Sequence, residues 1–379
     1  MRLLVASHDA SRTGAPLALL TLLRWLQREH PEVEIEVLLW RGGALVPAYE
    51  AVAAVTVLHP PPGRRSLPET VEVGFDEVGW RRLSQTMTAA RVRARLRGRA
   101  EPDLVLLNGA GSGILLRHLR TSAPVLAHVH ELARGLDLCL PGDLRARFFA
   151  RADAFVAVSQ RVADNLTGTE GLTADRVTVI HECLPERGPV APPPAVASGP
   201  PLVASVGAGS WRKGVDLFLL VAAGVRRRVG DDVRFAWVGP LDDEASVLAD
   251  RRGLGLDEVL ALPGEVTDPA RWFGEMSVFC LTAREDPFPL VAIEAGAARV
   301  PVVAFDNGGV TELLADGRGS VVGYADVEAM ADRVAAILRG GDGGAADRLA
   351  GHVAELHTPG VMGRRLWAVI ESLVADGRT

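Results

Sequence analysis

A proline-rich segment divides the chain into two parts of similar pattern. Residues 187–201 contain six prolines. Neither a helix nor a strand can continue through such a run, because proline lacks a backbone N–H and fixes φ. On each side, short runs of valine, leucine and alanine alternate with segments of helical period. This alternation is typical of parallel sheets covered by helices, so we predict an α/β fold of two tandem Rossmann-like domains.

The expected strands are short apolar runs with turn residues on either side. They are 3–7, 34–40, 55–58, 104–108, 125–130, 155–159 and 177–180, then 202–207, 233–238, 259–262, 278–281, 302–305 and 320–322. We accordingly place domains at 1–186 and 202–355, with a linker at 187–201. Residues 356–379 hold an amphipathic helix that we expect to pack near the domain junction. A ligand is expected in an interdomain cleft, where the carboxyl edges of the two sheets face each other.

Composition excludes several classes of protein. Of the 379 residues, 48% are hydrophobic and 23% are charged, which is enough apolar material for two cores and argues against disorder. A net charge of -6 gives no field that attracts nucleic acid. No apolar run is long enough to span a bilayer, and the first residues lack the apolar centre of a signal peptide. We therefore expect no nucleic-acid partner, no transmembrane segment and a cytoplasmic location.

Several motif-like patterns are incomplete. The glycines at 109, 111 and 113 do not have the spacing of a dinucleotide fingerprint. His130 and Glu131 resemble the start of a zinc-protease helix but lack its second histidine. The chain contains no Asp-x-Asp pair and no Gly-x-Ser-x-Gly elbow. We therefore expect no resident metal and no cofactor.

Arginine alternates with other residues at positions 91, 93, 95, 97 and 99. At helical period these side chains would spread around the helix, which favours a solvated helix. A patch for a membrane surface or an anionic acceptor is the alternative, so a peripheral membrane contact stays open.

A glycine-bearing turn with two adjacent cations, Arg212 and Lys213, follows the first strand of the second half. Lys213 is the only lysine among 41 Lys and Arg residues. A compact ammonium is not interchangeable with a planar guanidinium, so this position favours a specific charge requirement over a solvent-facing turn. Backbone N–H groups, a helix N-terminus and an ammonium group together suit a diphosphate.

Two carboxylates flank another expected helix start in the second half. Pro289 can begin a helix, which leaves Asp286 on the preceding loop and puts Glu294 inside the helix. Carboxylates accept hydrogen bonds from pairs of hydroxyls, as a sugar or a ribose offers. The alternative is that Asp286 only caps the helix and that Glu294 is exposed.

In combination, these segments resemble the retaining glycosyltransferases of family 4, which have the GT-B fold. Arg212, Lys213 and Gly214 match the family's Lys-Gly segment, and Asp286 and Glu294 match its Glu-x7-Glu spacing. The segments 308–312 and 324–331 also look like the family. The likeness extends over essentially the whole chain and is strongest from 203 to 338.

The resemblance implies roles for individual residues. Lys213 would bind the donor diphosphate, Glu294 the donor ribose and Asp286 hydroxyls of the transferred sugar. Gly14 would approach the diphosphate, and His130 would lie near the anomeric centre, although a histidine bonded inside the cleft wall is the alternative. The catalytic set is then His130, Lys213, Asp286 and Glu294. The donor-binding set is Gly14, Arg212, Lys213, Glu265, Val266, Asp286, Phe288, Pro289, Leu290 and Glu294.

Two positions depart from the family pattern. Asp286 stands where the family has glutamate, and Glu285 beside it could compensate for the shorter reach. Ala208 replaces an arginine that many relatives carry, so Arg212 is expected to supply the second positive charge.

The function implied is metal-independent, retaining transfer of a sugar from a nucleotide-diphosphate sugar to an acceptor. The acceptor is a glycan, a lipid-linked molecule or a natural product, bound mainly by the N-terminal domain. The alternatives are a nucleotide-sugar epimerase or hydrolase of GT-B fold, and a non-catalytic nucleotide-sugar-binding protein.

Overall fold

The computed structural model describes residues 1–59, 81–184, 199–266 and 268–377. Within it the chain forms two compact units. The N-terminal unit holds Met1–Val158, Val162–His181 and Pro359–Thr379, and the C-terminal unit holds Ser159–Arg161 and Glu182–Thr358. Most of the linker expected at 187–201 lies outside the described residues.

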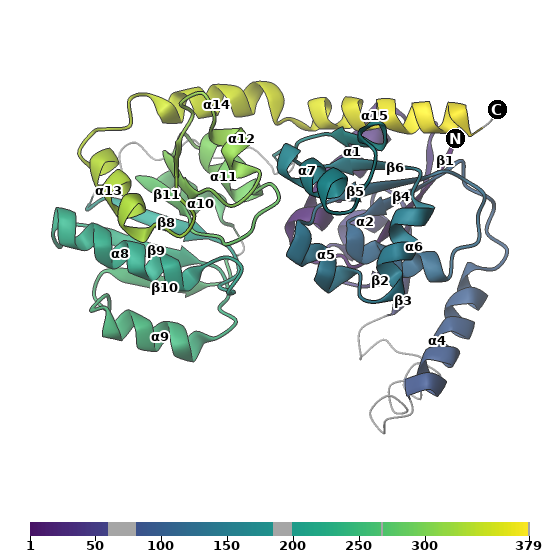
Figure 1. Cartoon of the computed structure of the whole chain (residues 1–379), viewed down its shortest axis with the longest axis horizontal. Helices are drawn as coiled ribbons and strands as arrows, with labels where there is room; N and C mark the ends of the chain where they lie inside the picture. The colour runs from purple at the N-terminus through teal and green to yellow at the C-terminus, as the bar shows by residue number, and fades with distance from the viewer. Residues whose placement is uncertain (60–80, 185–198, 267, 378–379) are drawn as a thin grey trace. The chain divides into compact units, whose positions relative to one another are not determined.

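The N-terminal unit is built on a parallel sheet of seven strands in the order β3-β2-β1-β4-β5-β6-β7 (Figure 1). Its strands are β1 (Arg2–Ser7), β2 (Glu34–Arg41), β3 (Ala54–His59), β4 (Leu104–Asn108), β5 (Val125–Val129), β6 (Ala154–Ala157) and β7 (Val177–Val179). β4 and β5 are buried along their whole length, as strands covered on both faces are. The strand order reverses between β1 and β4, which makes the carboxyl ends of these strands the switch point of the sheet.

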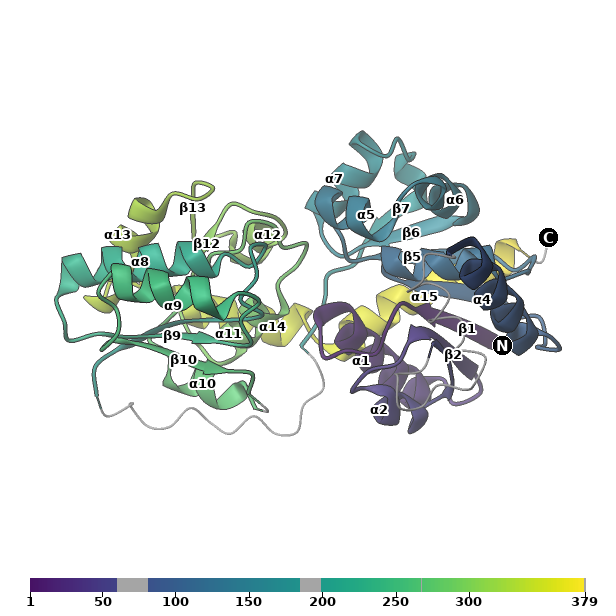
Figure 2. The ribbon, with the colours of Figure 1, turned by 90° about the horizontal axis from the view of Figure 1, so that it is seen from below.

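Helices connect and cover these strands. They are α1 (Gly14–Glu29), α2 (Val46–Glu50), α4 (Arg81–Leu96), the 3-10 helix η2 (Ala110–Arg117), α5 (Ala133–Cys139), α6 (Asp143–Arg151), α7 (Gln160–Gly168), η3 (Ala174–Arg176) and α15 (Pro359–Asp376). The last helix, α15, packs on α1, at the other end of the sequence (Figures 1 and 2). A Cβ built at Gly363 would lie 2.2 Å from the ring of Trp25, so the two helices approach closely because position 363 has no side chain.

The arginines at the end of α4 do not all face solvent as the sequence suggested. Arg91 donates a hydrogen bond to the carbonyl of Leu58 at 2.6 Å, and Arg95 donates to that of Val57 at 3.0 Å. Arg99, one turn further on, donates to the hydroxyl of Thr56 at 2.9 Å. The expectation of a solvated helix therefore holds only in part for this face, because the edge strand β3 offers oxygens that the guanidinium groups reach.

The C-terminal unit has a parallel sheet of six strands in the order β10-β9-β8-β11-β12-β13. Its strands are β8 (Leu202–Val206), β9 (Arg234–Val238), β10 (Leu260–Gly264), β11 (Val278–Leu281), β12 (Val302–Phe305) and β13 (Ser320–Val322). The strand order reverses between β8 and β11. The segments that follow these two strands therefore meet at the switch point of this sheet.

Seven helices among the described residues surround the second sheet. They are α8 (Val215–Val229), α9 (Glu244–Gly253), α10 (Ala270–Glu275), α11 (Leu290–Ala297), α12 (Val310–Leu314), α13 (Val327–Leu338) and α14 (Ala345–Leu356). One hydrophobic core joins the sheet to α8, α9 and α13, with Phe218 and Trp237 at its centre in edge-to-face contact. This core fixes the start of α8, which carries the predicted diphosphate site.

The α/β prediction is confirmed. Each strand expected from the sequence is present to within two residues at either end. None of the helices in the described part of the chain has the length and apolar character that a membrane span needs.

Candidate functional site

The predicted donor-binding segments follow strands at the carboxyl edge of the second sheet. The turn 207–214 follows β8 and holds Arg212 and Lys213, and Asp286 follows the neighbouring strand β11. Because parallel strands present the same ends at one edge, the turn after β8 and the loop after β11 are brought together at the switch point.

Glycine at position 214 allows the turn to dock on the next strand connection. Gly214 has φ of 71°, in the left-handed region, and a Cβ built there would lie 2.1 Å from the carbonyl oxygen of Thr282. The Thr282 hydroxyl donates to the carbonyl of Gly214 at 2.9 Å. The turn thus ends where α8 begins, with Gly214 at its N-cap position.

An ion pair joins the two segments. The Lys213 ammonium lies 2.5 Å from Oδ2 of Asp286. The Asp286 side chain is only 6% exposed and that of Lys213 19%. The Asp286 main chain is held as well, because it forms a parallel bridge to Gly308 and its carbonyl accepts from the N–H of Gly309 at 3.2 Å. The sequence placed these two charges in one site but did not foresee that they pair with each other.

The alternative in which Asp286 only caps the following helix does not describe this loop. Pro289 occupies the N-cap position of α11, and no side chain caps that helix. Glu294 is half-buried in the middle of α11. Phe288 is buried and stacks on His357, with ring centroids 5.5 Å apart, while Leu290 begins the helix and is half-buried.

Arg284 is a residue of this site to which the sequence had given no role. Its guanidinium binds both carboxylate oxygens of Asp216, at 2.9 and 2.6 Å, and lies 4.9 Å from the ring centroid of Trp211. This hydrogen bonding lowers the pKa of Asp216. The main-chain N–H of Arg284 also donates to the carbonyl of Arg212 at 2.7 Å, so Arg284 joins the loop after β11 to the turn after β8. The position of Arg284, two residues before Asp286, was the one feature of the sequence that could have indicated this role.

The remaining predicted residues of this unit lie at its surface. Arg212 is exposed and donates to the carbonyl of Glu285 at 2.9 Å. Glu265 is exposed and Val266 half-buried after β10, which is separated from β8 by β9.

Two predicted residues, Gly14 and His130, belong to the N-terminal unit. Gly14 is the first residue of α1 after β1, and His130 directly follows β5. The buried Asn108, at the end of β4, connects the two places. Its Oδ1 lies 3.1 Å from Nε2 of His130, and its Nδ2 donates to the carbonyl of Ala15 at 3.2 Å. Asn108 therefore orients His130, a role that the sequence pattern did not predict.

Glu131 supports the same edge. Its carboxylate accepts the main-chain N–H of Ala110 at 3.0 Å and that of His130 at 2.9 Å. Burial raises the pKa of Glu131 to about 7, although these N–H groups act in the opposite direction. Burial, with a smaller contribution from His8, lowers the pKa of His130 to about 3. His130 is therefore a neutral imidazole at pH 7.

Comparison with known proteins agrees with this architecture. The family described as Glycosyl transferases group 1 matches residues 200–340, and that described as Glycosyltransferase Family 4 matches residues 45–185. The chain belongs to the family 4, or group 1, glycosyltransferases. One of the two family models matches residues before the proline-rich segment, and the other matches residues after it.

Named relatives are similar over long stretches. The lipopolysaccharide core biosynthesis mannosyltransferase LpcC of Rhizobium leguminosarum bv. viciae is 30% identical over 244 residues, 60% of this chain and 65% of that protein. The chain therefore aligns with somewhat less than two thirds of that relative's length. D-inositol 3-phosphate glycosyltransferase of Xylanimonas cellulosilytica is 26% identical over 370 residues, which cover 89% of this chain and 85% of that protein.

Solved structures share the fold. The HepE protein of Anabaena, in complex with UDP and glucose, superposes with a TM-score of 0.74 at 17% identity, covering 98% of this chain and 99% of that one. WaaG, a glycosyltransferase involved in lipopolysaccharide biosynthesis, has a TM-score of 0.70 at 11% identity, with 98% and 99% covered. At these identities the likeness concerns the fold, which is GT-B.

Proposed function

We propose that this glycosyltransferase moves a sugar from a nucleotide-diphosphate sugar to an acceptor, with retention of anomeric configuration and without a metal ion. The observation that carries the proposal is the Lys213–Asp286 pair at the switch point beside the N-terminus of α8. It offers a cation to a diphosphate and a carboxylate to sugar hydroxyls at one place.

Lys213 stabilises the leaving diphosphate in this proposal. An ammonium group has three N–H donors, and Asp286 takes one of them. The other two N–H groups can donate hydrogen bonds to phosphate oxygens, whose negative charge grows as the bond to the sugar breaks. The first N–H groups of α8 add to this positive field. Asp216 lies in the first turn of α8, but Arg284 neutralises its charge. The Asp216 carboxylate therefore does not cancel the positive field at the start of the helix.

Asp286 and Glu294 recognise hydroxyl groups in this proposal. The ion pair uses Oδ2 of Asp286, so Oδ1 can accept a hydrogen bond from a hydroxyl of the transferred sugar. Glu294 would accept from the ribose. In the N-terminal unit Gly14 would approach the diphosphate. His130, held neutral by its low pKa, would act near the anomeric centre as a hydrogen-bonding group rather than as a cation.

The relatives suggest which donors to test first. LpcC is named a mannosyltransferase, and HepE has been solved with UDP-glucose. We therefore propose a hexose on a nucleoside diphosphate as the donor. Thermal stabilisation by UDP-, GDP-, ADP- and TDP-sugars ranks the candidates, because a ligand that binds only the folded chain raises its Tm.

The deciding experiment replaces Lys213. We expect Lys213→Ala to lower kcat/KM by about 10²- to 10³-fold, the usual cost of losing one preorganised charge donor. Lys213→Arg should restore little of this loss, because a planar guanidinium does not reproduce a compact ammonium. The matched control is Arg252→Ala, at an exposed position on α9, which should leave the rate unchanged. Activity of Lys213→Ala within a few-fold of wild type would remove Lys213 from the donor site.

Product analysis with the preferred donor tests the reaction type. Transfer with retention gives an acceptor-linked sugar with the donor's anomeric configuration, which NMR detects. Free sugar formed equally fast without any acceptor would indicate a hydrolase, and a changed sugar on intact nucleotide an epimerase. Donor binding without turnover would indicate a binding protein.

A further inference from the structure

A groove at the amino-terminal edge of the first sheet lies outside the site described above. It has a cavity volume of about 470 Å³ and is lined by the start of β1, the end of α4 and the segments 97–102 and 118–121. Residues 101 and 102 precede β4, and residue 121 precedes β5. The groove is therefore at the opposite edge of the sheet from Gly14 and His130. We call it the arginine groove.

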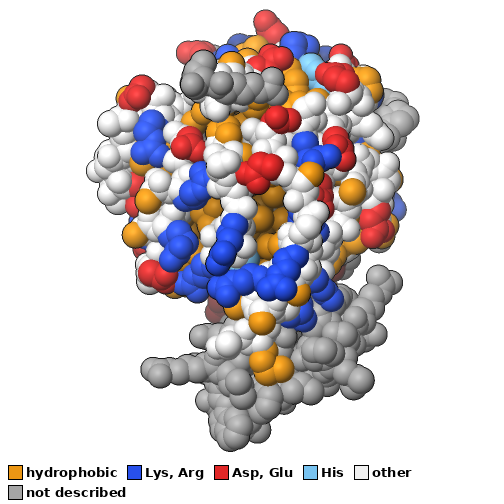
Figure 3. All heavy atoms as spheres, turned by 90° about the vertical axis from the view of Figure 1, so that its right-hand side faces the viewer, with side chains coloured by type: hydrophobic (Ala, Val, Ile, Leu, Met, Phe, Trp, Pro, Cys, Tyr) orange, Lys and Arg blue, Asp and Glu red, His pale blue; other side chains and the backbone are white. Residues whose placement is uncertain are grey.

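The arginine groove carries an excess of positive charge. Its lining includes five arginines and two glutamates: Arg2, Arg93, Arg97, Arg99, Arg120, Glu36 and Glu101. Arg2 pairs with Glu34, and Arg99 pairs with Glu36. Glu101 instead accepts from the hydroxyl of Thr121 at 2.5 Å and from the main-chain N–H of Ser122 at 2.7 Å. Figure 3 shows the resulting band of basic side chains on this face of the molecule.

Three arginines of the groove have no ion pair or hydrogen bond with any described residue: Arg93, Arg97 and Arg120. Arg93 and Arg97 are four residues apart, so they lie on one face of α4 and the turn that follows it. Arg91, Arg95 and Arg99 instead donate hydrogen bonds to oxygens of β3, although Arg99 also lines the groove. Arg91, Arg95 and Arg99 are thus held by the sheet edge, whereas Arg93 and Arg97 line the groove without a partner among the described residues.

A half-buried histidine lies beside these charges. His118 lines the groove and stacks on Trp40 with an interplanar angle of 13°. Its Nδ1 is buried and has no hydrogen-bond partner among the described residues. Burial lowers the pKa of His118, and the charges of Arg93 and Arg117 lower it further. Both effects favour the neutral imidazole.

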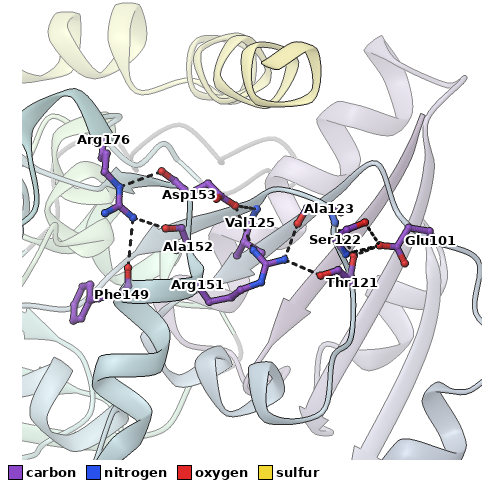
Figure 4. A network of polar contacts seen from close by, with 10 residues as sticks. All are labelled: Glu101, Thr121, Ser122, Ala123, Val125, Phe149, Arg151, Ala152, Asp153 and Arg176. Carbon is purple, nitrogen blue, oxygen red and sulfur yellow. Dashed lines mark hydrogen bonds and ion pairs between the residues drawn. The ribbon is translucent and has the colours of Figure 1, made fainter. Parts of the chain in front are cut away.

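The wall of the groove is already fixed by its own hydrogen bonds. Figure 4 shows Glu101 holding Thr121 and Ser122 from one side, while Arg151 donates to the carbonyls of Thr121 and Ala123. A ligand would therefore not have to order this segment when it binds. Leu119 and Thr121 also line a second cavity of about 670 Å³, whose other walls combine apolar side chains with Asp143, Arg147 and Arg151.

We infer that the arginine groove is a binding site for a phosphate group, held by the guanidinium groups of Arg93, Arg97 and Arg120. Guanidinium groups match phosphate oxygens with pairs of parallel N–H donors, and three unpaired cations in one groove repel each other until an anion binds. The site is distinct from the diphosphate site proposed beside Lys213 and does not depend on it. A soluble phosphate ester and the headgroup of a phosphate-bearing lipid present the same chemistry.

The test uses the full chain and two triple variants. The first carries Arg93→Gln, Arg97→Gln and Arg120→Gln. The control carries Arg252→Gln, Arg364→Gln and Arg365→Gln, at exposed positions outside the groove, and changes the net charge equally. Binding of glycerol 3-phosphate is measured by calorimetry at fixed low ionic strength. Binding to phosphatidylcholine vesicles with and without phosphatidic acid is measured by flotation, and circular dichroism verifies the fold.

We expect wild type and control to bind at least one of these phosphate probes, and the groove variant to bind it at least 10-fold more weakly. Binding of glycerol 3-phosphate identifies a soluble ligand, and binding only to phosphatidic acid vesicles identifies a lipid; either outcome supports the site. The proposal is overturned if wild type binds neither probe, or if both variants lose binding equally. It is also overturned if vesicles containing oleate, an anion without phosphate, bind as well as phosphatidic acid vesicles.

Discussion

Lys213 and Asp286 hold each other in place across 73 residues of sequence. Neither charge could be assigned to the other from the sequence, because the spacing between them says nothing about which side chains meet. The apolar strands that place them could be predicted, since the carboxyl ends of adjacent parallel strands always meet at one edge. Pairing of this kind makes the two residues depend on each other for stability.

We expect Asp286→Asn to lower the free energy of unfolding by about 1–3 kcal/mol, less than a fully buried pair would lose because Lys213 keeps some contact with water. Urea unfolding measures this change. Asp347→Asn, which breaks an exposed pair with Arg299, should change the free energy by less than about 1 kcal/mol. Equal effects of the two variants would contradict a stabilising role for the Lys213–Asp286 pair.

His130 and Glu131 contribute to the pH dependence of stability with opposite signs. The pKa of His130 falls from 6.5 to about 3 on folding, so between these values only the unfolded chain gains a proton and stability rises with pH. The pKa of Glu131 rises from 4.5 to about 7, so between these values only the unfolded chain loses its proton and stability falls with pH. From about pH 4.5 to 6.5 the two effects oppose each other.

Single substitutions should separate these effects. Over pH 4.5 to 6.5, Glu131→Gln should make stability rise more steeply with pH than in wild type, and His130→Gln should make it fall or rise less. Urea unfolding at three pH values across this window measures both slopes. Superimposable profiles for wild type and the two variants would show that neither residue has the assigned pKa.

Among the elements, the strands and most helices could be predicted because apolar runs and helical periods are local signals. The arginines of α4 could not, because their partners are main-chain oxygens of β3, more than thirty residues away. The same holds for Asn108, which looks like an ordinary strand end but bonds to His130 at the end of the neighbouring strand β5. A residue whose role depends on a distant oxygen leaves no periodic trace in the sequence.

The turn after β8 allows a test at this scale. Gly214→Ala adds a Cβ at positive φ and against the carbonyl of Thr282, so the free energy of unfolding should fall by at least about 2 kcal/mol. Gly253→Ala is the control: it lies in α9 with no atom near the added Cβ and should stabilise by about 0.5–1 kcal/mol. A tolerated alanine at 214 would mean that the turn can open away from Thr282.

For the whole molecule, the docking of α15 on α1 is the feature to test. Gly363→Leu would force a side chain into the space that Trp25 occupies, and we expect overpacking to cost about 1–3 kcal/mol in the N-terminal unit. Ala368→Leu, on the exposed face of α15, is the matched control and should cost little. Calorimetry of the full chain reports the change. An unaltered unfolding profile for Gly363→Leu would show that α15 is not tightly docked.

Because α15 belongs to the N-terminal unit, the main segment of the C-terminal unit, residues 182–358, is inserted between two parts of the N-terminal unit. This has a consequence for recombination among relatives. Exchange of the C-terminal unit as a cassette requires two crossovers, one near each of these positions. A single crossover in the middle of the gene would also import a foreign last helix, and Trp25 would then face a residue that had not been selected to leave room for it.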